Sequence, residues 1–403
     1  MDTRRRWYIA TGLVIVALIL ATDPFTILDR VFRRPVPVQP ENAVANAARV
    51  VRETGLPGAE YLIGAFDTAP VVFLGEFPQV ADHAAFVTNT VPALGNAGVR
   101  TIALEHLRTA DQAAIDALVG AVGKEPEDFD AATAEELLFR RDVTWGFREY
   151  RDILQAVWEF NRTSGDSPIR VRGLGLARDP ETSPEQHEVR LEAHMSEELA
   201  GVVAESAVGS RGVLVYVSAR RAIPGIPDLA FRQAATAAGL TTTAPRRLAV
   251  WAEEELGTPS ATILLHAPWP EESARYGLDY PAAGLLDHAV FASGRADPEL
   301  PWGFDVKDTD LGSVSIDPLG LRPDTDTAPL SELTDGYMVV APLSELQAAT
   351  PIPDFVRPEW EAEALARYPG EIPDSADGED INRYIARTSE NLGRILESFR
   401  DVE

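Results

Sequence analysis

The chain has 403 residues, of which 45% are hydrophobic, so it is long enough for one large domain or two smaller ones. It contains no cysteine, which excludes disulfides, thiolate metal sites, haem attached through a CxxCH motif and a cysteine nucleophile. Residues 1–34 carry six Arg and three Asp, whereas the formal net charge of the whole chain is −27. An acidic body predicts no nucleic-acid partner and favours basic ones.

The N-terminus has the pattern shared by signal peptides and short membrane anchors. Three arginines at 4–6 precede the fifteen uncharged, mostly apolar residues 7–21. A small-x-small cleavage site is missing, because Ile19 and Ala21 would occupy its two key positions. We therefore expect residues 1–22 to form an uncleaved transmembrane helix, with the body on the extracytoplasmic (periplasmic) side of the membrane.

Residues 23–41 connect this expected anchor to the body. Phe25, Leu28 and Phe32 are spaced by three and four residues, which favours a short helix lying in the membrane interface. The following PVPVQP, residues 35–40, predicts a stiff extended spacer. The body is thus expected to stay close to the bilayer.

Residues 42–350 alternate short apolar runs with helical patterns. The expected strands are 71–75, 99–104, 169–176, 212–217, 261–266 and 336–341, and the expected helices are 83–96, 109–121, 145–162, 185–207 and 228–238. Strands that are apolar at most positions are typical of a buried parallel sheet. We expect an α/β domain with a mostly parallel sheet and helices on both faces, and ligands at the carboxyl ends of the strands.

The last third of the chain is less regular. Residues 293–333 are rich in Pro, Gly and Asp and are expected to form long surface loops. The tail, residues 351–403, contains the stripe Ile381, Tyr384, Ile385, Leu392, Ile395, Leu396 and Phe399. This stripe predicts an amphipathic helix that packs on the domain or on a partner.

Common catalytic motifs are missing from the sequence, namely GxSxG, HExxH, GxxxxGK[ST] and GxGxxG. Asp305, Asp308 and Asp310 lack the glycine and glutamate spacing of a calcium loop. His187 and His194 lie seven residues apart in a helix of mixed charge, which favours a solvated face over a pair of ligands.

Two strand ends remain as candidates. Glu76 follows the first expected strand, and Glu105 and His106 follow the second. If these strands are neighbours, the two carboxylates face one crevice, where they can share a proton or hold a cation. Alternatively, each glutamate caps the helix that follows it. The spacing leaves both interpretations open.

The order of these segments resembles the ChaN-like superfamily of haem-binding-uptake and Tiki proteins, to which erythromycin esterase-like proteins are related. In that family a strand ends in Gly-Glu-x-His and a further His opens the next helix. Gly75, Glu76 and His83 match this pattern, but Pro78 occupies the position of the motif histidine. A second strand ending in Glu is similar to LEH at 104–106.

The resemblance extends over roughly residues 65–235. The family's helix with Trp and Tyr-Arg-x-Ile-Leu is similar to residues 144–160, which include Trp145, and its next strand is similar to residues 171–179. A later Gly-x-x-His followed by Gly-Val-Pro is similar to residues 215–229. There, Arg221 or Arg220 stands in place of the histidine.

The resemblance implies a site that has lost its proton-transfer groups. Proline has no titratable side chain, and arginine stays protonated, so neither acts as a base or binds a metal. An arginine at 220 or 221 can instead neutralise Glu76 or Glu105. We expect no metal, no cofactor and no catalytic residue. The expected binding residues are Gly75, Glu76, Glu105, Trp145, Arg220 and Arg221.

Three functions remain. The first is a non-catalytic accessory subunit, anchored in the membrane, that stabilises a membrane protein complex such as a respiratory or photosynthetic assembly, or docks basic extracytoplasmic proteins on it. The second is a hydrolase of an ester or peptide with a rearranged site of Glu76, His83, Glu105 and His106. The third is a protein that binds haem or another small molecule, with a histidine such as His83 as an axial ligand.

Overall fold

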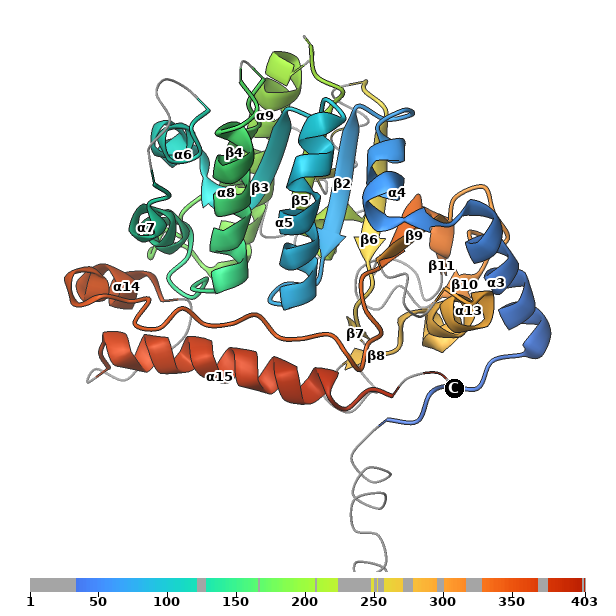
Figure 1. Ribbon diagram of the computed structural model, residues 1–403. Coiled ribbons are helices and arrows are strands. Elements are labelled where there is room, and N and C mark those ends of the chain that lie inside the picture. Colours follow the sequence, from blue (N-terminus) through green and yellow to red (C-terminus); the bar gives the residue numbers. More distant parts are fainter. Residues whose placement is uncertain are drawn as a thin grey trace, which may run out of the picture.

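The computed structural model describes residues 34–121, 128–165, 167–206, 209–223, 248–249, 252, 257–270, 278–295, 301–316, 328–368, 376–400 and 402. Its centre is an eight-stranded sheet with the order β1-β9-β12-β6-β2-β5-β3-β4 (Figure 1). These strands are β1 (Leu56–Pro57), β2 (Val71–Glu76), β3 (Thr101–Arg108), β4 (Arg170–Gly175), β5 (Val213–Ser218), β6 (Ser260–Leu265), β9 (Trp302–Asp305) and β12 (Gly336–Val339). Two short antiparallel pairs lie outside it, β7 (Trp269–Pro270) with β8 (Leu278–Asp279) and β10 (Ser315–Ile316) with β11 (Ala328–Pro329).

The six strands expected from the sequence are all present and all run parallel. β2 lies between β5 and β6, and β3 lies between β5 and β4, with every pairing parallel. β12 extends the parallel set beside β6. The mostly parallel α/β fold is thus confirmed, and β2, β3, β5 and β6 bring their carboxyl ends to one edge.

The expectation of loops throughout residues 293–333 is wrong at β9, which joins the sheet antiparallel to β12. Its sequence, WGFD, is short and contains a glycine, and such a pattern predicts a turn. Gly303 has a packing reason, because a Cβ there would lie 2.3 Å from the ring of Tyr61. Gly303 makes β9 hard to recognise in the sequence, and its missing side chain leaves the space in which the ring of Tyr61 packs against the strand.

Helices cover both faces of the sheet. The α-helices are α3 (Glu41–Thr54), α4 (Gly58–Ala65), α5 (Ala81–Asn96), α6 (Gln112–Leu118), α7 (Ala131–Arg141), α8 (Arg148–Asn161), α9 (Pro184–Ser206), α10 (Ala219–Ala222), α13 (Leu285–Ser293), α14 (Glu361–Arg367) and α15 (Gly378–Leu396). Short 3-10 turns are η1 (Thr109–Asp111), η3 (Pro281–Gly284), η4 (Leu330–Glu332) and η5 (Pro358–Trp360). In Figure 1, α4, α5 and α8 lie in front of the sheet. Separate apolar clusters pack on the two faces, one with α4, α5, α7 and α8, the other with α3, α9 and α13.

The C-terminal helix packs on the domain. Asp377 and Asp380 form a capping box at the start of α15. Ile381 and Ile385 enter the core beside α7 and α8, and Leu396 lies in a smaller apolar cluster with Val80 and Phe399. α15 runs across the side of the molecule toward which the strands' carboxyl ends point (Figure 1).

Three expectations fall outside the described residues, namely the helix at 228–238, the transmembrane helix at 1–22 and the interfacial helix that includes Phe25, Leu28 and Phe32. Among the residues that are described, none of the helices combines the length and the apolar character needed to cross a membrane. The first described residue, Arg34, donates its backbone N–H to the carbonyl of Ser398, 2.6 Å away. The described chain therefore begins beside its C-terminal end.

Candidate functional site

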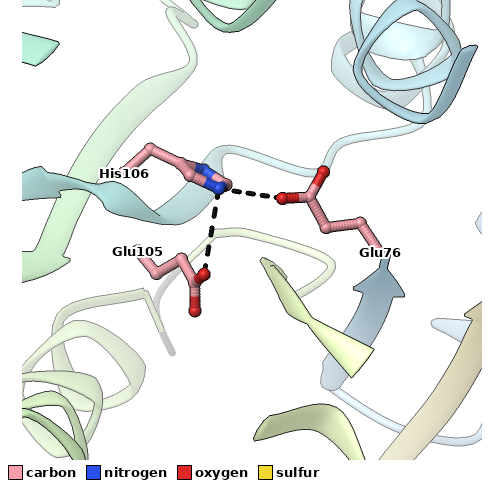
Figure 2. A group of neighbouring side chains, drawn as sticks. All are labelled: Glu76, Glu105 and His106. Atoms are coloured by element: carbon pink, nitrogen blue, oxygen red, sulfur yellow. Dashed lines mark hydrogen bonds and ion pairs between the residues drawn. The ribbon is translucent and has the colours of Figure 1, made fainter. Parts of the chain in front are cut away.

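An irregularity in β3 brings Glu105 and His106 to the same place. In a regular strand, consecutive side chains point to opposite faces. Here the register of β3 with β4 shifts between Leu104 and Arg108, and polar atoms of Glu76, Glu105 and His106 lie within 4.8 Å of one another (Figure 2). Such bulges redirect side chains beside active sites.

Two glycines of β4 make this irregularity possible. A Cβ on Gly173 would lie 2.6 Å from the carbonyl oxygen of Arg108, and one on Gly175 would lie 2.5 Å from that of Glu105. Both contacts are shorter than any side chain tolerates. The two glycines of RGLGLAR, residues 172–178, therefore leave room for the bulged strand.

Glu76 is a completely buried carboxylate that accepts hydrogen bonds from three side chains. It is 0% exposed. The hydroxyl of Tyr150 lies 3.0 and 3.1 Å from its two oxygens, Nε2 of His106 lies 2.9 Å from Oε1, and the hydroxyl of Tyr216 donates to Oε2. Burial, and then the charge of Glu76, raise the pKa of both tyrosines well above the ordinary value, so they stay protonated donors.

The turn containing Pro78 holds one of these donors. Gln79 adopts a φ of 68°, which is uncommon for a residue other than glycine. In this conformation its backbone N–H donates to the hydroxyl of Tyr150 at 3.0 Å. Gln79, the residue after Pro78, thus fixes the hydroxyl of Tyr150, which in turn donates to Glu76.

His106 lies between the two carboxylates. Because Glu76 is acceptor-only when ionised, Nε2 of His106 carries the proton of their 2.9 Å hydrogen bond. Its Nδ1 is buried and has no hydrogen-bond partner among the described residues. The ring packs against Trp145 and Tyr150, with centroid distances of 5.0 and 4.4 Å. An imidazole is therefore present in the cluster, although Pro78 and Arg220 or Arg221 occupy two of the positions at which the resemblance expects a histidine.

Glu105 has a carboxylate oxygen that is left without a hydrogen bond. Its side chain is 5% exposed, and Oε2 has no hydrogen-bond partner within the described ranges. Nη1 of Arg221 lies 3.3 Å from this oxygen, and Arg141 donates from Nε to the backbone carbonyl of Glu105 at 2.9 Å. The sequence left open which arginine reaches the glutamates, and the structure places Arg221 there, while Arg220 is exposed.

Arg221 contacts two further carboxylates from α9. Glu188 lies 2.7 Å and Glu192 3.5 Å from its guanidinium. Burial alone lowers the pKa of Arg221, but the charges of Glu105, Glu188 and Glu192 outweigh burial and raise it above the ordinary value. Arg221 is a fixed cation among three carboxylates, and it cannot accept a proton.

A cavity of about 460 Å³ opens beside these groups, at the carboxyl ends of β2, β3, β5 and β6. Its apolar wall is formed by Leu191, Ile223, Leu264, Leu265 and Trp269. Glu105 and Trp145 line it, and Nε1 of Trp145 is buried without a hydrogen-bond partner among the described residues. A buried acceptor and a buried donor that both lack hydrogen bonds, in a mostly apolar cavity, are typical of a binding site for a small organic molecule.

The structure also brings in two tyrosines that the sequence did not single out, and a histidine that the sequence assigned to a solvated face. Tyr150 and Tyr216 complete the surroundings of Glu76, and His187 lines the cavity rather than a solvated face. Burial, and then the charge of Arg141, lower the pKa of His187 to about 4, so its imidazole is neutral at pH 7. Tyr216 lies in the apolar run VLVYVS, where a lone polar hydroxyl was the available signal.

His83 does not join this cluster. It is 0% exposed. Its Nδ1 accepts from the backbone N–H of Phe77 at 3.1 Å, so Nε2 carries the proton and donates to the backbone carbonyl of His266 at 3.1 Å. With both ring nitrogens engaged, His83 is neither a base for the cavity nor an axial ligand for haem.

The sequence matches no family model and no curated protein. Several solved structures resemble its fold. A succinoglycan biosynthesis protein matches with 12% identity and a TM-score of 0.47 over 77% of this chain and 99% of its own. A variant of the erythromycin esterase EreC in its open conformation matches with 10% identity and a TM-score of 0.45, covering 73% and 95% of the two chains.

A third structure, of cofacial haem binding to ChaN of Campylobacter jejuni, matches with 14% identity and a TM-score of 0.30 over 51% of this chain and 85% of that one. Two of these structures thus come from the families that the order of sequence motifs resembles. The likeness concerns the α/β fold, and the function is argued below from this chain's own residues.

Proposed function

We propose that the cavity beside Glu105 binds a small ester or amide and hydrolyses it, with Glu105 as the general base. The observation that carries this proposal is the buried Oε2 of Glu105 in the cavity wall, which has no hydrogen-bond partner among the described residues and only an ion-pair contact with Arg221 at 3.3 Å. A bound water or substrate that donates a hydrogen bond to this oxygen would satisfy it.

The chemistry follows from the groups around this oxygen. Glu105 takes a proton from a water as the water oxygen forms a bond to the substrate carbonyl carbon. Nε1 of Trp145 donates a hydrogen bond to the carbonyl oxygen, on which negative charge develops. When the tetrahedral intermediate collapses, the bond to the leaving group breaks and Glu105 returns its proton to that group. Arg221 holds the carboxylate of Glu105 in place throughout.

Glu76 has a different role in this scheme. Its oxygens are occupied by Tyr150, Tyr216 and His106, and it is completely buried. We therefore assign it to positioning, because it ties the end of β2 to β3 and β5 and so fixes the bulge that carries Glu105.

The test is hydrolysis of p-nitrophenyl acetate, p-nitrophenyl butyrate and the corresponding anilides by the full chain. General-base catalysis typically contributes 10²- to 10⁴-fold, so Glu105→Gln should lower kcat/KM at least about 100-fold. Glu60→Gln removes an exposed carboxylate on α4 and serves as the matched control, with activity unchanged. Turnover that survives in Glu105→Gln, or no turnover above the buffer rate in the parent chain, would refute the proposal.

The location and partners of the body form a second, separate proposal. The accessory role and the membrane anchor rest on residues 1–41, the acidic charge and the substituted motifs. If residues 1–22 anchor the chain, the structure indicates which side of the body would face the bilayer. Arg34, where the described chain begins, donates its backbone N–H to Ser398, just past the end of α15, and α15 runs across the side of the molecule toward which the strands' carboxyl ends point (Figure 1). A chain anchored through residues 1–22 would then turn the edge of the sheet that carries the cavity toward the membrane.

Two measurements test this second proposal. Intact-mass analysis of protein from native membranes should find residues 1–22 retained, and a mature N-terminus near residue 22 would contradict the anchor. Size exclusion with mass spectrometry after mild solubilisation should find the chain within a larger complex. Elution as a lone monomer would contradict the accessory role and leave the hydrolase proposal untouched.

A further inference from the structure

A second cavity, of about 190 Å³, lies on the other side of the segment that follows β6. It is lined by His266 and by residues of α13, of the chain after β12 and of the C-terminal end. Its apolar wall consists of Val290, Phe291, Val339, Pro342, Leu343 and Val402. Phe291 is 47% exposed at its rim, which is unusual for a side chain of this size.

A chain of hydrogen bonds leads from the core to this cavity. The hydroxyl of Tyr337 accepts hydrogen bonds from the backbone of Ala267 and the side chain of Trp269, and burial raises its pKa well above the ordinary value. Tyr337 therefore keeps its proton and donates a hydrogen bond to Nδ1 of His266, 3.1 Å away. With Nδ1 as an acceptor, the single N–H of the ring is on Nε2 of His266, which donates to Oδ1 of Asp287 at 3.1 Å.

Asp287 ends this chain as an acceptor with one oxygen unused. Its side chain is 10% exposed and lines the cavity. Oδ2 is buried and has no hydrogen-bond partner among the described residues. Because the tautomer of His266 is fixed by Tyr337, the histidine cannot also satisfy Oδ2. A molecule inside the cavity that Asp287 lines can donate a hydrogen bond to this oxygen.

The remaining polar residues of the wall define the charge of that molecule. Glu345 and Arg400 also line the cavity, so two carboxylates face one guanidinium and the formal charge of the wall is negative. A buried carboxylate is stabilised most by a cationic donor. An apolar cavity of about 150 Å³ accommodates benzene, so this cavity has room for one aromatic ring and a short arm.

We propose that this second cavity binds a small aromatic ammonium, with the ring among Val290, Leu343 and Val402 and the ammonium on Oδ2 of Asp287. The site is distinct from the one beside Glu105, although both use the segment 264–269. Its existence does not depend on the hydrolase proposal.

The probes are benzylammonium, benzyl alcohol and toluene, titrated into the full chain by calorimetry at pH 7. Benzylammonium should bind saturably and at least about 10-fold more tightly than benzyl alcohol, and toluene should bind most weakly. Asp287→Asn should remove the preference for the ammonium over the alcohol. Glu105→Gln, in the other cavity, should leave all three affinities unchanged.

A second variant keeps the test decisive if Asp287→Asn fails to fold. Val402→Trp places a larger side chain at the cavity wall and should block all three probes. The proposal is overturned if no probe binds saturably, if the ammonium and the alcohol bind equally well, or if binding survives Val402→Trp.

Discussion

Nη1 of Arg221 lies 3.3 Å from Oε2 of Glu105, and the same guanidinium contacts Glu188 and Glu192 of α9. One buried cation thus links β3 to α9 across the wall of the cavity. Replacing it leaves three carboxylates without their common partner, whereas its neighbour Arg220 is exposed at the edge of the cavity that it helps to line. The two adjacent arginines form a matched pair for experiment.

Arg221→Met should lower the free energy of unfolding by about 3–5 kcal/mol, because removing one partner of a buried ion pair leaves uncompensated charge. Arg220→Met should change it by less than about 0.5 kcal/mol, as surface substitutions usually do. Urea unfolding followed by circular dichroism compares the two variants. Equal effects would show that Arg221 does not hold the three carboxylates together.

Tyr216→Phe tests the hydrogen-bond network around Glu76. The change removes one donor to a buried charge while keeping the ring, and should cost about 1.5–3 kcal/mol. Tyr384→Phe, on the exposed face of α15 where the side chain is 42% exposed, is the control and should be neutral. Thermal unfolding of both variants is the measurement. A stability of Tyr216→Phe equal to that of the parent would mean that Glu76 is satisfied without this hydroxyl.

The sequence predicted the strands of the parallel sheet because they are apolar at nearly every position, as β2 and β5 show. It left open whether Glu76 and Glu105 face one crevice or cap the helices that follow, and it tied the crevice to neighbouring strands. In the structure β5 lies between β2 and β3, yet both glutamates line the same cavity. The bulge in β3 was not predictable from this pattern. A regular strand would turn His106 away from Glu105, and only the register with β4 shows that both reach the same cluster.

Other parts of the site depend on contacts between residues far apart in the chain. Tyr216 lies 140 residues from Glu76, and nothing in VLVYVS indicates which partner its hydroxyl has. Likewise, the alternation of charge around His187 predicted solvent, because the cavity against which α9 packs is formed by other segments. β9 was missed because its glycine serves the packing of Tyr61 and not a turn.

The expectation that the site holds no metal stays a prediction, and the structure gives it a sharper reason. Glu76, Glu105 and His106 offer the carboxylate and imidazole ligands that zinc and manganese accept. A metal there would have to displace the hydrogen bond between His106 and Glu76 and compete with the hydroxyls of Tyr150 and Tyr216 for the same oxygens. We expect less than about 0.1 equivalent by elemental analysis of protein purified without chelator. About one equivalent, lost in Glu76→Ala, would reverse this conclusion.

His83 should make the stability of the fold depend on pH. Burial lowers its pKa to about 4 in the folded protein, against an ordinary value of 6.5. The unfolded chain therefore binds the proton more tightly, so the stabilisation is complete above pH 6.5 and is lost as the pH falls toward 4. Between pH 7.5 and pH 5.0, this one group should remove about 2 kcal/mol from the free energy of unfolding.

The measurement is urea unfolding at both pH values for the parent chain and for His83→Gln, which has no titrating group at this position. His187, whose pKa is also lowered to about 4, titrates in the same direction, so the parent chain should lose more than the contribution of His83 alone. The variant should lose about 2 kcal/mol less than the parent over this range, whatever its absolute stability. Equal losses would mean that His83 titrates alike in the folded and unfolded chains, and that its hydrogen bonds to Phe77 and His266 do not require the neutral ring.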